Sequence, residues 1–222
     1  MKSNILVIAP HPDDEVLGCG GIIKRYSCEG HNVYILIVTR GTTKMYSDSR
    51  IAEGRKQALQ AHKILGVSET FFFDYPAPEL DLISVAEIAD SISRLIMQLR
   101  VTMLFIPHEG DIHLDHSAVF KASLVASRPF GDYTVKSIYA YETLSETEWA
   151  SPRSDSLFKP DHFVNIGKHL QSKLDSMACY RGQLRVFPHP RSLETIEALA
   201  KFRGSTVGYP SAEAFMTIRT IE

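Results

Sequence analysis

Two short clusters of histidine and aspartate each follow an apolar run that is typical of a buried strand. Residues 11–15 (His-Pro-Asp-Asp-Glu) follow the run at 5–9, and residues 113–116 (His-Leu-Asp-His) follow the run at 103–106. In an open parallel sheet, ligands bind in the crevice beyond the carboxyl ends of the strands. Two strands that both end in such residues therefore predict one shared site at one edge of a sheet.

The rest of the chain favours such a sheet. Further apolar runs alternate with helical patterns, the runs at 33–38, 71–73, 137–141 and 162–166 and the helices at 50–65 and 85–99. Because the runs are continuous, both faces of the sheet are expected to be buried. The pattern predicts an α/β fold with a mostly parallel sheet, followed over 167–222 by helices and a proline-rich loop.

Local signals mark the helix ends. Gly66 is a natural residue to end the helix at 50–65, and Ser84 with Glu87 forms a capping-box pattern before the helix at 85–99. Three glycines after the first strand lack the spacing of a dinucleotide-binding loop, and we expect them to let a helix pack closely against the sheet. They are Gly18, Gly20 and Gly21.

Composition limits the classes of protein. The chain has 222 residues, of which 44% are hydrophobic and 23% charged, and a net charge of −2. This predicts a single domain over residues 1–222 and no nucleic-acid partner. The apolar runs are far shorter than the ~20 residues that span a bilayer, so no integral membrane segment is expected. Since the chain runs straight into a strand, we expect no signal peptide and a cytoplasmic location.

The two clusters contain residue types that bind metals. His11 and Asp14 lie three positions apart on the turn that leaves the first strand, and His116 comes from the opposing loop. Two imidazole nitrogens and one carboxylate hold a divalent metal and leave a position free for water. The set suits Zn²⁺, and it suits Fe²⁺ or another divalent metal as well.

Other residues of the clusters are candidates for catalysis. Asp13 lies beside the ligand Asp14 and is a candidate base for a water on the metal. His113, three positions before His116, is expected to face the substrate. If Asp115 holds His113 protonated, this imidazole would stabilise an oxyanion or protonate the leaving group. The clusters therefore predict a metal-dependent hydrolase.

The two clusters in this order resemble those of the zinc-dependent de-N-acetylase family called PIG-L or LmbE-like. The resemblance extends over nearly the whole chain. Its further matching segments are Arg50-x-x-Glu53, Leu65-Gly66-Val67, Asp74 and residues 212–215.

The resemblance implies a Rossmann-like three-layer α/β/α fold and zinc on the three ligands named above. It implies Asp13 as general base, His113 oriented by Asp115, and Arg50 as a substrate-binding residue. The reaction would be hydrolysis of the acetamide of an N-acetylated amino sugar, which releases acetate and a free amine. A soluble, nucleotide-linked or glycosidic sugar is favoured, because the chain lacks a membrane segment.

Further residues are candidates for substrate contacts. His189 and Arg191, in the proline-rich stretch 187–191, would close over the site or reach a neighbouring subunit of a homo-oligomer; the rigid sequence is also explained by chain direction alone. Arg50 has a local ion pair with Glu53 as its alternative role.

The roles of several residues remain open. Glu15 either orients a ligand or begins the next helix, and Trp149 either stacks on a sugar or is packed. Charged residues also follow the other strands and would converge on the same edge of the sheet. They are Arg40, Asp74 and Glu142.

Three other assignments compete with the deacetylase. A phosphoesterase with two metals ~4 Å apart needs more carboxylates and histidines than the clusters offer. A non-catalytic sugar- or nucleotide-binding module would need the ligands but not Asp13. A purely structural metal site would need four protein ligands, often cysteines, and the three cysteines of this chain form no CxxC pair.

Overall fold

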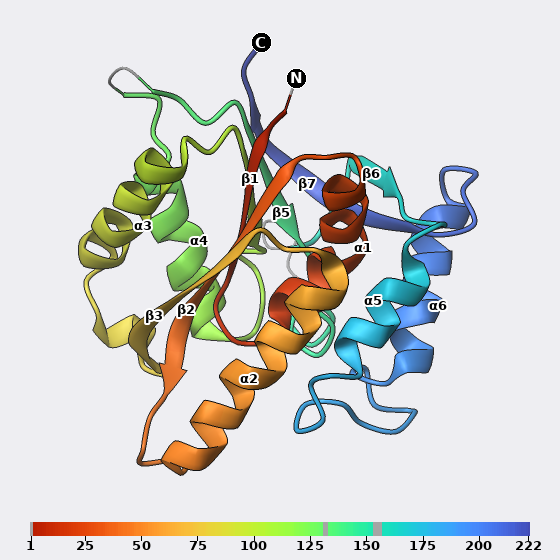
Figure 1. The fold of residues 1–222 in the computed structure, drawn as a ribbon, viewed down its shortest axis with the longest axis horizontal. Coiled ribbons are helices and arrows are strands. Elements are labelled where there is room, and N and C mark those ends of the chain that lie inside the picture. The colour runs from red at the N-terminus through yellow and green to blue at the C-terminus, as the bar shows by residue number, and fades with distance from the viewer. Residues whose placement is uncertain (1, 131–132, 153–156) are drawn as a thin grey trace.

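The computed structural model describes residues 2–130, 133–152 and 157–222, and at its centre lies a seven-stranded sheet. The strand order is β3-β2-β1-β4-β5-β7-β6 (Figure 1). The strands are β1 (Asn4–Ala9), β2 (Asn32–Gly41), β3 (Glu69–Ala77), β4 (Met103–Pro107), β5 (Ser137–Tyr141), β6 (His162–Asn165) and β7 (Ala212–Thr220). Strands β1 to β5 pair in parallel, and β7 is antiparallel to β5 and β6. The prediction of a mostly parallel sheet is confirmed.

Helices cover both faces of this sheet, so the architecture has the three layers that the resemblance implied (Figure 1). One face carries α3 (Val85–Leu99) and α4 (Leu114–Ala126). The other carries α1 (Asp14–Cys28), α2 (Asp48–Leu65), α5 (Leu170–Met177) and α6 (Leu193–Ser205). A short 3-10 helix, Leu80–Leu82, follows β3.

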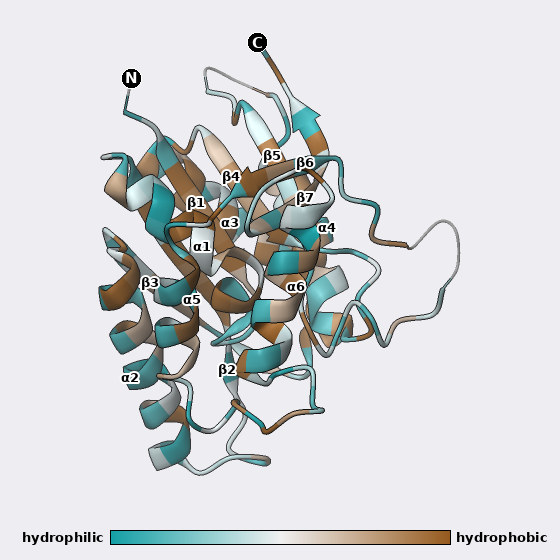
Figure 2. Cartoon of the chain, turned by 90° about the vertical axis from the view of Figure 1, so that its right-hand side faces the viewer, coloured by the Kyte–Doolittle hydropathy of each residue, from teal (hydrophilic) through white to brown (hydrophobic). Residues whose placement is uncertain are grey.

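The sheet divides the hydrophobic core into two clusters. Along β1, Ile5 and Val7 pack with residues of α1 and α2, whereas Leu6 and Ile8 pack with residues of α3 and α4. This alternation follows because successive side chains of a strand point to opposite faces. Figure 2 shows the hydrophobic strands inside and more hydrophilic helix surfaces outside.

The helix patterns at 50–65 and 85–99 correspond to α2 and α3. Helix α2 begins at Asp48 and ends before Gly66, whose φ of 79° is a left-handed conformation that glycine adopts without strain. The predicted capping box at α3 is wrong, because Ser84 makes no side-chain capping bond. Its backbone carbonyl accepts the N–H of Glu87 instead, and both exposed side chains are free to bind water.

The C-terminal segment departs further from the expectation. Helices α5 and α6 do form, but residues 212–220 form strand β7, which inserts between β5 and β6. Phe215 of this strand is fully buried in the core. The pairing joins segments far apart in the chain, so local patterns could not reveal it.

The three glycines of α1 allow close packing, as expected. A Cβ atom on Gly18 would lie 2.2 Å from Cδ2 of Tyr141 in β5, and one on Gly21 would lie 2.7 Å from Ile166. A Cβ atom on Gly20 would meet the side chain of Lys173 at 3.0 Å. Helix α1 therefore lies against the sheet at a distance that larger residues would prevent.

A buried ion pair forms hydrogen bonds with backbone groups of α1 beside these glycines. Lys173 Nζ lies 2.6 Å from Glu213 Oε1 and also donates to the carbonyl of Leu17. The Glu213 carboxylate accepts the N–H groups of Gly21 and Ile22 at 2.8 Å each. The segment 212–215 thus has a structural contact with α1, and it joins the C-terminal strand to the helix that follows the first cluster.

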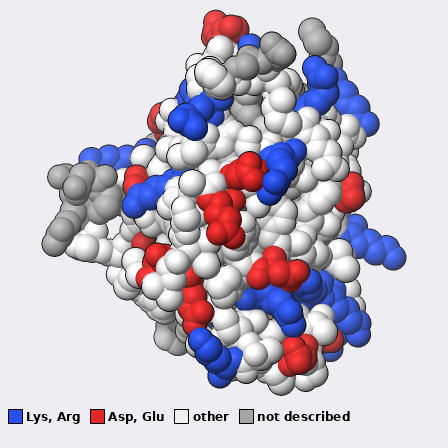
Figure 3. Space-filling model, turned by 90° about the vertical axis from the view of Figure 1, so that its left-hand side faces the viewer, with Lys and Arg blue, Asp and Glu red and all other residues white. Residues whose placement is uncertain are grey.

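The surface shows mixed charges. Acidic and basic side chains both lie on the face shown in Figure 3, among uncharged residues, and in α3 Arg94 lies 3.0 Å from Asp90. Among the described residues, no helix is both long enough and apolar enough to cross a membrane.

Candidate active site

The two histidine–aspartate clusters meet because β1 and β4 are parallel neighbours in the sheet. The chain leaves β1 through residues 10–13 into α1, and it leaves β4 through residues 108–113 into α4. The carboxyl ends of parallel strands lie at the same edge. The rings of His11 and His113 are consequently 4.5 Å apart.

Three side chains direct their donor atoms toward one another, and they are the three predicted ligands. Asp14 Oδ2 lies 3.2 Å from His11 Nδ1 and 3.3 Å from His116 Nε2. One ligand atom of each residue lies within 4.8 Å of the other two. Asp14 and His116 are buried, whereas His11 is partly exposed and lines a pocket.

Two atoms of this trio are buried and unpaired within the described chain, which favours a metal ion at this position. In the part of the chain that the structure describes, Asp14 Oδ1 and His116 Nε2 are buried without a hydrogen-bond partner. Such atoms are costly unless they are bound, and carboxylate oxygen and imidazole nitrogen are ligands for Zn²⁺ and Fe²⁺. A second group, His11 with His113 and Asp115, has suitable residue types, but both Asp115 oxygens already accept protein hydrogen bonds.

Buried carboxylates orient the two ligand histidines. Asp115 Oδ2 lies 2.9 Å from His11 Nε2, and Asp111 Oδ2 lies 2.8 Å from His116 Nδ1. A carboxylate on the second nitrogen fixes the orientation of an imidazole ligand and strengthens it as a donor. Asp111 is not singled out by the sequence pattern; the one available signal is that it is an acidic residue between β4 and the second cluster.

The contacts of Asp115 differ from the expectation. Its carboxylate oxygen lies 4.0 Å from His113 Nδ1, while it bonds His11 and the backbone N–H of Leu80. His113 Nδ1 instead accepts the backbone N–H of Asp115 at 3.2 Å. Burial, together with the charge of His11, lowers the pKa of His113 to about 4. The carboxylate therefore does not hold His113 protonated.

The electrostatics of the trio favour an ionised Asp14. Burial would lower the pKa of His11, but hydrogen bonds to Asp115 and Asp14 raise it to about 9. At His116, burial would likewise lower the pKa, but Asp14 and Asp111 raise it to about 10. Burial would raise the pKa of Asp14, yet the two imidazoles hold it well below its usual value. Asp14 is thus an anion, the form that binds a cation.

Asp13 lies beside the trio in an unusual backbone conformation. Its φ is 114°, and its side chain makes no helix-capping bond. The residue is buried and lines the pocket. Burial raises the pKa of Asp13 to about 8, although Arg191 acts in the opposite direction. Its carboxyl is therefore a candidate for exchanging protons.

Arg191 comes from the far end of the chain and contacts four side chains around the pocket. Its Nη1 lies 3.3 Å from Asp13 Oδ2 and 3.1 Å from Gln183 Oε1. Its Nε donates to Ser145 Oγ, and its Nη2 lies 3.2 Å from Glu146. Arg191 therefore joins the 181–192 loop to the first cluster.

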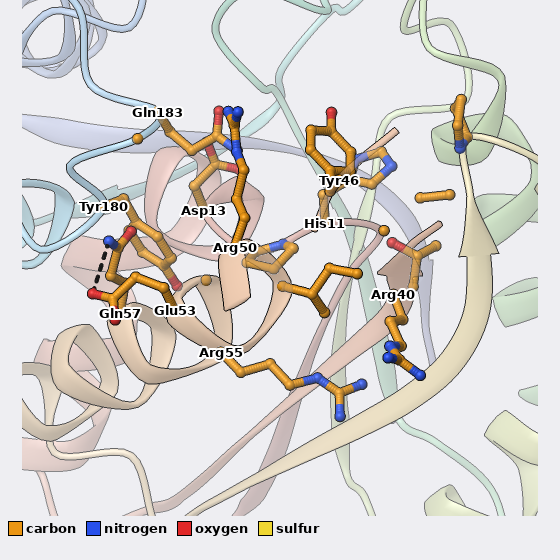
Figure 4. Close-up of a pocket in the computed structure, with 18 of the residues that line it drawn as sticks. His11, Asp13, Arg40, Tyr46, Arg50, Glu53, Arg55, Gln57, Tyr180 and Gln183 are labelled. Atoms are coloured by element: carbon orange, nitrogen blue, oxygen red, sulfur yellow. Dashed lines mark hydrogen bonds between the residues drawn. The ribbon is translucent and has the colours of Figure 1, made fainter. Parts of the chain in front are cut away.

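The pocket beside these residues has a volume of about 440 Å³. Figure 4 shows Asp13, Tyr180 and Gln183 on one side of it and Tyr46 and Arg40 on the other. Its wall also includes His113, Glu146 and, from α2, Arg50, Glu53 and Arg55. The volume lies within the range of small-molecule sites.

Arg50 lines this pocket, as a substrate-contact role requires, and so does Arg40, which was expected at this edge of the sheet. The guanidinium of Arg50 lies over the ring of Tyr46, 5.1 Å from its centroid. Glu53 pairs with Lys56 at 3.8 Å, so the expected alternative, an Arg50–Glu53 ion pair, is not the contact found for Glu53. Arg40 pairs with the exposed Asp48 at 3.1 Å.

Other predicted contacts fall outside the pocket wall. His189 Nδ1 accepts the backbone N–H of Arg191, and its ring contacts Trp149 edge-on. Neither ring is part of the wall. Asp74 and Glu142 are held in ion pairs with arginines, and Glu142 lines a different pocket. Asp74 lies within β3 rather than after it, and Glu142 directly follows β5, so neither position brings the side chain to the site.

Glu15 is fully buried in the first turn of α1, and its carboxylate bonds Asp13 rather than one of the three predicted ligands. Its Oε2 accepts the backbone N–H of Asp13 at 3.1 Å, and its Oε1 accepts from His62 Nε2 at 3.1 Å and from the Tyr180 hydroxyl. Burial, reinforced by Glu15, raises the pKa of Tyr180, which therefore stays a hydroxyl. No sequence motif marks His62 or Tyr180, because their roles depend on packing.

Comparison with known proteins identifies a family over the part of the chain that contains both clusters. The family model "PIG-L: GlcNAc-PI de-N-acetylase" matches residues 6–127, which include both clusters. An uncharacterized deacetylase of Escherichia coli (strain K12), YaiS, is 32% identical over 169 residues, which are 73% of this chain and 86% of that protein.

A more distant relative has a named substrate. The diacetylchitobiose deacetylase of Thermococcus kodakarensis is 25% identical over 191 residues, which are 81% of this chain and 69% of that protein. The fold also occurs in an enzyme of another kind. The crystal structure of GalB, the 4-carboxy-2-hydroxymuconate hydratase of Pseudomonas putida KT2440, has a TM-score of 0.79 at 19% identity and covers 100% of this chain and 99% of its own.

The fold alone is thus shared with a hydratase, whereas the two sequence relatives given above are named as deacetylases. The family model spans more than half of the chain, and it contains the ligand trio and Asp13. The chain therefore belongs to the PIG-L family, whose model is named for a GlcNAc-PI de-N-acetylase.

Proposed function

We propose that this protein is a metal-dependent hydrolase that removes the N-acetyl group from an amino sugar and releases acetate and a free amine. The observation that supports it most is that the ligand trio reaches a pocket through His11, and that a separate carboxyl, that of Asp13, lines the same pocket. A binding module would need the trio alone. The carboxyl of Asp13 supplies what hydrolysis needs in addition, a group that accepts a proton from water.

His11, Asp14 and His116 would hold the metal, and the buried partners Asp115 and Asp111 would keep the two imidazoles oriented. Two nitrogens and one oxygen favour Zn²⁺, and Fe²⁺ would fit the same set. A bound divalent ion would polarise the acetamide carbonyl and lower the pKa of water toward neutrality.

Asp13 would accept a proton from the attacking water. It lines the same pocket as His11, which supports this role, because a base must lie within hydrogen-bond reach of the proton that it takes. Arg191 would hold the carboxylate in place through its contact at 3.3 Å. Once protonated, Asp13 would carry the proton that the departing amine nitrogen requires.

His113 would donate a hydrogen bond to the oxygen that becomes negative during the reaction. Its Nδ1 accepts the backbone N–H of Asp115, so its own proton is on Nε2. The residue lines the pocket close to His11. A fixed donor at the developing charge stabilises the transition state without the need for a protonated imidazole.

The proposed substrate class rests on the names of related proteins. The family model is named for a GlcNAc-PI de-N-acetylase, and one relative for diacetylchitobiose. The pocket of about 440 Å³, with several arginine, glutamate and tyrosine side chains, is of a size and polarity that suit a sugar. We therefore propose an N-acetylated amino sugar, free or joined to a second group.

Acetate release tests the proposal. The Zn²⁺-loaded protein is incubated with N-acetylglucosamine, diacetylchitobiose and nucleotide- and inositol-linked N-acetylglucosamine. We expect release from at least one sugar, its loss after chelation, and its return with Zn²⁺ or Fe²⁺. The Asp13→Asn variant should keep one metal per chain and lose turnover, because its amide cannot accept the proton.

Other outcomes would point to other functions. Full activity in Asp13→Asn would contradict the assignment of the base. One bound metal per chain without acetate release from any sugar would contradict deacetylase activity on these sugars. It would favour a reaction at another bond or a sugar-binding module. A phosphomonoester and an unsaturated carboxylate in the same panel would then test hydrolysis and hydration.

A further inference from the structure

The backbone of Asp13 adopts a conformation that aspartate rarely takes. Its φ is 114° and its ψ is −27°, between the end of β1 and the start of α1. Non-glycine residues persist in such conformations only where their surroundings hold them, and these positions cluster at functional sites. The side chain makes no local capping bond, so other contacts must hold this residue.

The backbone of Asp13 is held on both sides. Its carbonyl accepts the N–H groups of Val16 and Leu17 in α1, and its N–H donates to the side chain of Glu15. Glu15 Oε2 accepts the Asp13 N–H at 3.1 Å, and Glu15 is 0% exposed. A buried carboxylate needs several donors to offset the loss of water. Its position is therefore set by the groups that bond its other oxygen.

Two buried side chains supply those donors from other parts of the fold. The Tyr180 hydroxyl, just after α5, donates to Glu15 Oε1, and His62 of α2 lies 3.1 Å from the same atom through Nε2. His62 Nδ1 lies 2.8 Å from Thr70 Oγ1 in β3. His62 and Tyr180 are 2% and 1% exposed.

The following arrangement of protons satisfies every member of this network. The Thr70 hydroxyl donates to His62 Nδ1, His62 Nε2–H and the Tyr180 hydroxyl donate to Glu15 Oε1, and the Asp13 N–H donates to Glu15 Oε2. Among the described residues, no side-chain atom of the network is buried without a partner. The network thus links β3, α2 and α5 to one backbone N–H at the pocket.

We infer that His62 and Tyr180 are positioning residues, which through Glu15 hold the Asp13 backbone in the conformation that directs its carboxyl into the pocket. This conformation serves the role of Asp13 as a base, and that role rests on the proposed function. None of the contacts of His62 or Tyr180 given above is to His11, Asp14 or His116. Loss of either donor should therefore disturb Asp13 without removing the metal.

Kinetic constants and metal content of three variants test the inference. Tyr180→Phe and His62→Leu each remove one donor with little change in volume, and His62→Gln keeps an N–H that can reach Glu15. We expect the first two to lower kcat about 10- to 100-fold, with KM and metal content near wild type. His62→Gln should restore most of kcat. The control is His162→Leu, which changes a partly buried histidine that packs on Tyr139 away from the pocket.

Amide hydrogen exchange of Asp13, measured by NMR, gives a result that does not depend on activity. We expect exchange about tenfold faster in Tyr180→Phe and His62→Leu, because the acceptor of the Asp13 N–H is no longer fixed. Exchange in His162→Leu should match wild type.

The outcomes separate this inference from the proposed function. Unchanged Asp13 exchange and kcat in both donor variants, or equal losses in His162→Leu, would overturn the positioning role. If the wild-type protein releases no acetate from any sugar, the proposed function fails, and the exchange rates alone decide whether His62 and Tyr180 hold Asp13.

Discussion

Arg191 Nη1 lies 3.3 Å from Asp13 Oδ2, although the two residues are 178 positions apart in the chain. The same guanidinium binds Ser145, Glu146 and Gln183. One side chain of the 181–192 loop thus contacts the candidate base and two other parts of the pocket wall. Activity should therefore depend on a residue that no motif of the first cluster contains.

Replacing Arg191 should lower activity strongly. Arg191→Leu removes charge-assisted bonds worth about 1.5–3 kcal/mol each, so we expect kcat/KM to fall at least about tenfold. Arg191→Lys should recover little, because an ammonium group cannot reproduce the fork of a guanidinium. Added guanidinium ion should partly rescue the leucine variant. Wild-type kcat/KM in Arg191→Leu would contradict the role of the contact with Asp13.

Asp111→Asn should weaken metal binding. Asp111 accepts a hydrogen bond from His116 at 2.8 Å and another from the Thr147 hydroxyl at 2.6 Å. Loss of a carboxylate behind an imidazole ligand typically costs about 10- to 100-fold in metal affinity or activity. Competition with a chelator measures the change, and Asp90→Asn on the outer face of α3 is the control. Equal affinity in both variants would show that Asp111 does not support the ligand.

Arg50→Met should raise KM with little change in kcat. Arg50 lines the pocket over Tyr46 and is not part of the ligand trio. A contact made equally in the bound substrate and the transition state affects binding alone. Steady-state kinetics on the best sugar of the panel measure it, with Arg94→Met as a surface control. A fall in kcat at constant KM would instead assign Arg50 to the reacting centre.

Gly18→Ala should destabilise the fold. The added methyl would lie 2.2 Å from the ring of Tyr141, whose hydroxyl is bonded to the carbonyl of Ile8. Overpacking of this kind costs about 1–3 kcal/mol of unfolding free energy. In Gly54→Ala, the matched control in α2, the methyl meets nothing within 4 Å, and the helix should gain about 0.5–1 kcal/mol. Urea unfolding of both variants checks the difference, and equal midpoints would contradict it.

Strands β1 to β6, the helices α2 and α3, and the proximity of His11, Asp14 and His116 could be predicted from the sequence, because each depends on short-range patterns. Continuous apolar runs mark buried parallel strands, and the order of strands and helices restricts the topology. His11 and Asp14 lie on one turn, and His116 follows a strand that such a sheet places beside the first. The shared location of the clusters therefore follows from local sequence and the geometry of parallel sheets.

The environment of those residues was decided only by the tertiary structure. Asp111 behind His116, Arg191 on Asp13, and His62 and Tyr180 on Glu15 come from segments whose proximity no local pattern encodes. Strand β7 is a similar case, since it pairs with β5 and β6 across long stretches of chain. The sequence by itself determined which chemical groups the site contains. The packing of distant segments decided how each group is held, because burial and hydrogen bonding depend on neighbours that only the folded chain brings together.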